Sequence, residues 1–145
     1  MFLQRDQFKD LEEQLKRLGI VGSCIDNKTA AMPYVGRENL LLEAQCILGC
    51  FYKSNLMLTG DPGVGKTTFV HKLADFLSTN SHHRFATPLI LEVNIASMLA
   101  NTRYRGEFEE KVSNLFSIIL TYENLILFFD EAHSMASTRS ESGIG

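Results

Sequence analysis

The 145-residue sequence predicts an α/β domain in which a parallel sheet is flanked by helices. Three observations support this fold class. Short apolar runs that suit buried strands alternate with longer segments of helical periodicity. A glycine-rich turn joins the first of these runs to a helix, which is the arrangement of a P-loop nucleotide-binding fold. The last apolar run ends in two carboxylates, and parallel sheets bind their ligands at the carboxyl ends of strands.

The N-terminal part of the chain is predicted to be a helix followed by a linker. Across residues 5–18, apolar side chains recur at spacings of three and four with charges between them. Gly19 follows where a helix often ends. Residues 22–32 are small and polar without periodicity, which indicates a linker. We therefore expect a short N-terminal helical arm over residues 1–21, the linker, and an α/β domain over residues 33–145.

The α/β part contains three expected strands and three expected helices. Each expected strand is an apolar run of four or five residues, too short for a helix and typical of a buried parallel strand. Each expected helix repeats apolar side chains at helical spacing. In order, these are a helix over 38–52, a strand over 56–59, a helix over 66–78, a strand over 89–93, a helix over 108–119 and a strand over 125–129.

Composition narrows the possible classes of protein. The chain is 45% hydrophobic and 21% charged, values typical of globular domains, and its net charge is −3. A nearly neutral chain offers no electrostatic case for binding nucleic acid or a membrane surface, so neither partner is expected. The chain has an odd number of cysteines (Cys24, Cys46 and Cys50), which indicates reduced thiols and a cytoplasmic location. A metal site is not expected, because it would need more ligands.

The most informative segment fits the phosphate-loop pattern G-x-x-x-x-G-K-[ST]. Glycines allow successive backbone N–H groups to surround phosphate oxygens, and the following helix adds its N-terminal dipole. Lys66 is expected to reach the β and γ phosphates, and Thr67 to offer its hydroxyl to Mg²⁺. The alternative is a strand–helix turn that binds nothing. The expected nucleotide contacts in this segment are Gly60, Asp61, Pro62, Gly63, Val64, Gly65, Lys66, Thr67 and Thr68.

Two acidic residues end the last expected strand. Asp130 is placed to hold Mg²⁺, directly or through water, beside the phosphate loop. Glu131 is placed to polarise the attacking water as general base, with Lys66 as the second catalytic residue. A solvated acidic turn after a core strand is the structural alternative.

These motifs together resemble the AAA+ ATPases, and in finer detail the first ATPase module of the Clp family of protein unfoldases and disaggregases. The resemblance covers residues 33–145. It rests on four segments: Pro33-Tyr34-Val35-Gly36-Arg37-Glu38, Gly60-Asp61-Pro62-Gly63-Val64-Gly65-Lys66-Thr67, Tyr104-Arg105-Gly106-Glu107-Phe108-Glu109-Glu110-Lys111 and Phe129-Asp130-Glu131-Ala132-His133. It implies an AAA+ fold, ATP and Mg²⁺ as ligands, and contact of Val35 and Gly36 with adenine.

The third segment resembles the family's substrate pore loop. The resemblance implies that Tyr104, Arg105 and Gly106 line the channel of a homo-oligomeric ring and grip a polypeptide. An aromatic ring can pack against any sequence, so the assignment has physical sense. The alternative is a tyrosine packed under its own loop between solvated arginines.

The sequence also departs from the family pattern. Family members continue with a sensor strand, an arginine finger and a helical lid, and we identify none of these within residues 1–145. Without a sensor strand, the phosphate-loop strand and the acidic strand are expected to lack a neighbour. Because the ring and the arginine finger are absent, little hydrolysis is expected from this chain alone.

Three functions are weighed. The first is ATP binding and hydrolysis within an AAA+ protein-remodelling machine. The second is a catalytically inactive nucleotide-binding or interaction module. The third is a nucleic-acid-directed P-loop ATPase.

Overall fold

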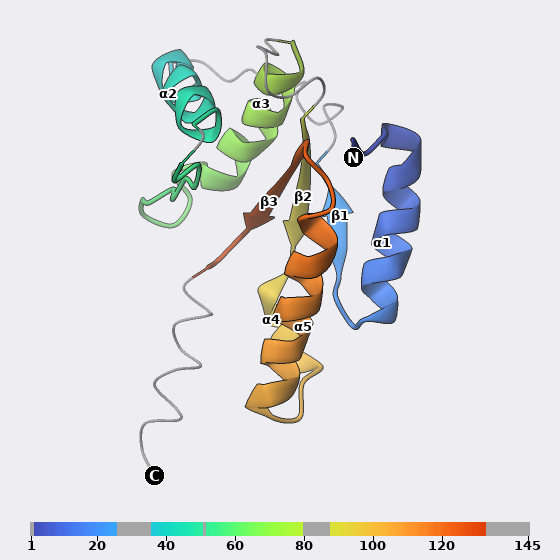
Figure 1. The fold of residues 1–145 in the computed structure, drawn as a ribbon. Coiled ribbons are helices and arrows are strands. Elements are labelled where there is room, and N and C mark those ends of the chain that lie inside the picture. Colours follow the sequence, from blue (N-terminus) through green and yellow to red (C-terminus); the bar gives the residue numbers. More distant parts are fainter. Residues whose placement is uncertain (1, 26–35, 51, 80–87, 133–145) are drawn as a thin grey trace. The chain divides into compact units, whose positions relative to one another are not determined.

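The computed structural model describes residues 2–25, 36–50, 52–79 and 88–132 (Figure 1). The chain divides into two compact units. The sheet unit consists of Met1–Cys24 and Leu89–Gly145, and the loop unit consists of Ile25–Pro88.

The sheet unit contains three strands in the order β1-β2-β3. Strand β2 (Leu89–Val93) and strand β3 (Leu125–Phe129) pair in parallel, with Leu89 opposite Leu125 and Val93 opposite Phe129. Strand β1 (Gly22–Cys24) pairs antiparallel with β2. The sheet is therefore mixed, which corrects the prediction of an all-parallel sheet.

The N-terminal helix is part of the core of the sheet unit. A 3₁₀ turn, η1 (Arg5–Gln7), leads into α1 (Phe8–Arg17), close to the predicted 5–18. Gly19, with φ +77°, ends the helix as predicted, and Ile20 N–H bonds to Leu15 O at 3.0 Å across the turn. Because Gly22–Cys24 form a strand, the predicted linker is wrong for these residues. Residues 26–32 of that segment lie outside the described residues.

The crossover from β2 to β3 contains two helices. Helix α4 (Ile95–Ala100) was not predicted from the sequence, because six residues with two buried side chains give too few repeats to show helical periodicity. Its N-cap residue, Asn94, accepts the Ser97 N–H at 3.0 Å. Helix α5 (Arg105–Ile119) confirms the prediction and begins three residues earlier than expected.

One face of β2 carries the core of the sheet unit. Leu89, Leu91 and Val93 alternate along the strand and therefore share a face. They belong to one buried cluster with side chains from α1 and α5, so both helices cover this face (Figure 1). The cluster comprises Leu3, Phe8, Leu11, Leu15, Ile20, Leu89, Leu91, Val93, Met98, Leu115 and Ile119.

The loop unit consists of two helices and the glycine-rich segment. Helix α2 (Glu38–Leu48) is shorter than the predicted 38–52, and α3 (Lys66–Thr79) matches the predicted 66–78 closely. The two helices pack together. The prediction of a strand at 56–59 is wrong, because these residues belong to no strand of the described part of the chain. An apolar run becomes a strand only when another strand pairs with its backbone, and no described strand does so here.

Candidate functional site

The phosphate-loop segment lies in the loop unit, immediately before α3. Gly63 and Gly65 have φ values of +83° and +92°, and nothing lies within 4 Å of a Cβ built at either position. Glycine is therefore required by the backbone conformation and not by lack of space. The Val64 N–H bonds to Asp61 O at 3.3 Å, and Phe69 N–H bonds to Gly65 O at 2.9 Å. The segment is thus a tight turn that continues directly into a 14-residue helix.

Lys66 is the first residue of α3, and its ammonium group returns to the turn. Nζ donates to Gly60 O at 2.6 Å and to Asp61 O at 3.3 Å. The positive charge is thereby held over the start of the loop. Thr67 and Thr68 follow in the first turn of α3, the first half-buried and the second exposed. Backbone N–H groups in this turn and the charge on Lys66 together favour an anion.

A cavity of about 270 Å³ lies beside this loop, within the loop unit. Its walls come from the start and inner face of α2, the residues before the phosphate loop, and the loop itself. The lining residues are Arg37, Leu40, Glu43, Ala44, Ile47, Leu56, Met57, Leu58, Thr59, Val64, Lys66 and Phe69. A hollow with both apolar and polar walls next to cationic groups can hold a small ligand. Sequence reasoning did not identify the α2 wall, whose apolar residues look like ordinary core positions.

Arg37 is another part of this site to which the sequence alone did not assign a role. It is the N-cap residue of α2, and its Nη2 donates to Val64 O at 3.1 Å. Of the predicted adenine contacts, Gly36 has a φ of +96° and is exposed, whereas Val35 lies outside the described residues. The only sequence signal for Arg37 was its position next to Gly36 in the quoted motif.

The acidic pair lies in the sheet unit, at the end of β3. Asp130 is half-buried and Glu131 is exposed. Glu131 has a φ of +52°, in the left-handed region, and its N–H bonds to Asp130 Oδ1 at 2.9 Å. Strain of this kind in a non-glycine residue is concentrated at functional sites. The structure thus places the phosphate loop and the acidic pair in different compact units, each with its own local geometry.

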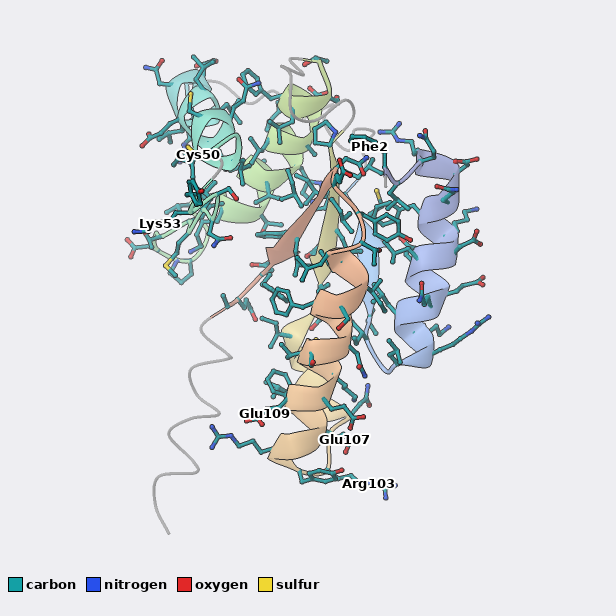
Figure 2. The ribbon with its side chains drawn as sticks, viewed as in Figure 1. Phe2, Cys50, Lys53, Arg103, Glu107 and Glu109 are labelled. Carbon is teal, nitrogen blue, oxygen red and sulfur yellow. The ribbon has the colours of Figure 1, made fainter. Side chains whose placement is uncertain are left out.

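Tyr104 precedes α5 in the sheet unit and is 66% exposed. A Cβ at Gly106 would lie 3.1 Å from Tyr104 Cε2, so the ring crosses over this glycine. The loop is held by local contacts: Glu107 Oε2 accepts the Arg103 N–H at 3.0 Å, and Arg105 Nε lies 3.2 Å from Glu109 Oε1. Figure 2 shows Arg103, Glu107 and Glu109 around the start of α5. The Tyr104 ring is thus largely exposed, with one edge against Gly106 of its own loop.

Two kinds of feature are absent from the part of the chain that the structure describes. In residues 2–25, 36–50, 52–79 and 88–132, no group of three or more His, Cys, Asp or Glu side chains is placed to hold a metal ion. None of the helices in these ranges is long and apolar enough to span a membrane.

Comparison with known proteins gives a consistent result. Residues 56–144 match the family described as "ATPase family associated with various cellular activities (AAA)". The chaperone protein ClpB of Aquifex aeolicus (strain VF5) is 32% identical over 146 residues, which is 97% of this chain and 14% of that protein. The ATP-dependent Clp protease ATP-binding subunit ClpL of Staphylococcus aureus (strain USA300) is 36% identical, covering 77% of this chain and 16% of that protein.

Solved structures agree with the sequence relatives. A structure described as the S. cerevisiae Hsp104-ADP complex matches with a TM-score of 0.67 and 25% identity, over 82% of this chain and 21% of that one. A closed-state reconstruction of Hsp104 with ATPγS and FITC casein matches with a TM-score of 0.65 and 25% identity, over 79% and 21% of the two chains. The chain therefore spans about a seventh to a fifth of the length of these relatives.

Proposed function

Because the chain belongs to the AAA family of ATPases, we propose that it binds and hydrolyses ATP within a polypeptide-remodelling machine. Its similarity to ClpB and Hsp104 supports the proposal. The observation that carries the proposal is the phosphate loop, in which two positive-φ glycines lead into Lys66 at the start of a long helix. This arrangement presents backbone N–H groups, a helix N-terminus and an ammonium group to phosphates.

Each motif residue has a proposed role. Residues Gly60–Thr68 surround the phosphates, with Lys66 neutralising the charge that develops on them. Val35 and Gly36 contact adenine. The hydroxyl of Thr67 and the carboxylate of Asp130 are hard oxygen donors, which is the ligand type that Mg²⁺ prefers. When bound, Mg²⁺ shares the negative charge of the phosphates with Lys66. Glu131 orients and deprotonates the attacking water.

Polypeptide handling is the second half of the proposal. The exposed Tyr104, with Arg105 and Gly106, packs against a substrate chain inside a homo-oligomeric ring. Ring formation and substrate gripping both belong to this proposal, since the chain spans 14% of the ClpB relative and 21% of the Hsp104 structure. The cytoplasmic location is also a proposal.

The first test removes the ammonium group of the phosphate loop. Lys66→Ala should lower the affinity for a fluorescent ATP analogue at least about a hundredfold, because a charged hydrogen-bond donor to phosphate is lost. Lys72→Ala removes a positive charge from the same helix and serves as the control. Equal affinity of wild type and Lys66→Ala, or no binding by wild type, would favour the inactive interaction module.

The second test separates binding from hydrolysis. Glu131→Gln should keep ATP affinity within about twofold while single-turnover hydrolysis of radiolabelled ATP falls at least about tenfold, since general bases contribute factors of this size or more. Glu110→Gln is the matched control on α5. Loss of ATP binding in Glu131→Gln would instead assign a structural role to Glu131. Stimulation of hydrolysis by single-stranded DNA rather than by casein would favour the nucleic-acid-directed ATPase.

A further inference from the structure

Arg37 and the Val64 carbonyl connect the start of α2 to the middle of the phosphate loop. The guanidinium Nη2 donates to Val64 O at 3.1 Å, and both residues line the cavity beside the loop. We propose that Arg37 is a positioning residue that fixes the orientation of the Val64–Gly65 peptide for phosphate binding. The inference rests on the proposed function, because it names a further residue of the same nucleotide site.

The geometry of the peptide unit explains how one hydrogen bond can orient a phosphate donor. In a trans peptide, the C=O of one residue and the N–H of the next point in opposite directions. A guanidinium that holds the Val64 carbonyl on the α2 side therefore turns the Gly65 N–H to the opposite side. That N–H belongs to the consecutive backbone donors with which a phosphate loop surrounds its ligand.

Backbone hydrogen bonds hold the peptides on either side of this one, through the Val64 N–H and the Gly65 carbonyl, and Arg37 holds the carbonyl between them. Gly63 and Gly65 flank Val64, both have positive φ, and nothing lies within 4 Å of a Cβ at either position. Gly65 adopts positive and negative φ about equally readily, so on its side the rotation of this peptide meets little steric resistance. The Val64 side chain is 40% exposed, although Cγ2 approaches Gly60 closely. The Arg37 hydrogen bond therefore selects one peptide orientation from several accessible ones.

The two cations of the site act on different parts of the loop. Lys66 donates to the carbonyls of Gly60 and Asp61, at the start of the loop. Arg37 comes from another element and holds the carbonyl of Val64. When Lys66 turns to a phosphate, its contacts with the start of the loop are given up, whereas the contact of Arg37 can persist. An arginine suits this task because its planar guanidinium stays charged and presents donors in a fixed geometry.

The experiment compares ADP with AMP, because the loop backbone and its lysine act mainly on the phosphates beyond the first. Binding of a fluorescent ADP analogue is measured directly, and AMP and ADP are measured by competition. Arg37→Ala should weaken ADP binding about five- to tenfold while AMP binding stays within about twofold, the size expected for one charge-assisted hydrogen bond. Arg37→Gln keeps a neutral side-chain donor and should recover part of the loss.

A charge control and a fold control complete the design. Lys53→Asn removes one positive charge from the loop unit at a position with φ +54°, which asparagine tolerates, and should leave both affinities unchanged. Circular dichroism melting of every variant reports whether the N-cap position of α2 has been damaged. If Arg37→Ala melts at a lower temperature than wild type and Arg37→Gln does not, the nucleotide affinities of Arg37→Gln are compared with those of wild type.

The outcomes separate this inference from the proposed function. Equal ADP affinities of wild type and Arg37→Ala overturn the positioning role and leave the ATPase assignment intact. Equal losses for ADP and AMP also overturn it, because they indicate a purely structural role. No difference between Arg37→Gln and Arg37→Ala overturns it as well, because it indicates a purely electrostatic role. Failure of the wild-type chain to bind ADP contradicts the proposed function itself.

Discussion

The sheet unit and the loop unit contain similar apolar segments but use them differently. In the sheet unit, β2 is paired on both edges and one of its faces is covered by α1 and α5. In the loop unit, the apolar run Leu56–Thr59 belongs to no strand of the described chain, and Met57 is 81% exposed. Local sequence is comparable in the two places, so the presence or absence of a pairing partner makes the difference.

The two units also differ in how much buried core they contain. The sheet unit has a continuous buried core and long-range hydrogen bonds, which are the features of a stable unit. The loop unit carries the phosphate loop, whose glycines permit the backbone conformation that phosphate binding requires. We therefore expect substitutions in the core of the sheet unit to cost the most stability, and substitutions in the loop unit to act mainly on nucleotide binding.

The largest expected effect tests whether α1 belongs to the core. Leu15 on α1 is fully buried, so Leu15→Ala should lower the free energy of unfolding by about 2–4 kcal/mol through lost burial and a cavity. The measurement is urea unfolding followed by circular dichroism. The control is Leu42→Ala on α2, at a side chain that is 51% exposed. Similar small losses for both variants would show that α1 is only an arm, as the sequence suggested.

The second effect concerns the contact between Leu3, near the start of the chain, and Asn124, the residue before β3. Asn124 is fully buried, and its amide accepts the Leu3 N–H at 2.8 Å and donates to Leu3 O at 3.0 Å. Asn124→Ala should cost about 2–3 kcal/mol, because it leaves two buried backbone groups of Leu3 without these bonds. Asn124→Asp keeps an oxygen that can accept the Leu3 N–H but sets a buried carboxylate against the Leu3 carbonyl, so it should cost at least as much.

The control for this variant is Asn55→Ala, at an exposed position of the loop unit. Urea unfolding of the three variants gives the comparison. A loss at Asn124 no greater than the loss at Asn55 would contradict the proposed contribution of this contact to stability.

The smallest expected effect tests whether the apolar run Leu56–Thr59 is unpaired. Met57→Lys should change the free energy of unfolding by less than about 0.5 kcal/mol, because the side chain is already exposed. In a buried central strand, the same substitution would bury a charge and cost several times as much. A large loss in thermal melting would therefore show that Leu56–Thr59 is a buried strand in solution.

Several features followed from local sequence patterns. Helical periodicity located α1, α2, α3 and α5, and apolar runs located β2 and β3 with their observed bounds. The glycine-rich motif was recognised because positive-φ glycines before a lysine and a helix have few alternative explanations, and Gly63 and Gly65 have such φ values. Glu131 was predicted as a candidate general base from its place after a strand, and its left-handed backbone was not foreseen.

Other features depended on segments that meet only in the folded chain. Strand β1 exists because Gly22–Cys24 pair with β2, and Asn124 contacts Leu3 from 121 positions away. Arg37 reaches Val64 across 27 positions, and Leu56–Thr59 lack a described partner despite a strand-like sequence. The sequence by itself determined which segments prefer helix, extended chain or a glycine turn, because those preferences are local. Only the tertiary structure decided which strands pair and which polar side chains meet, because those outcomes depend on distant residues.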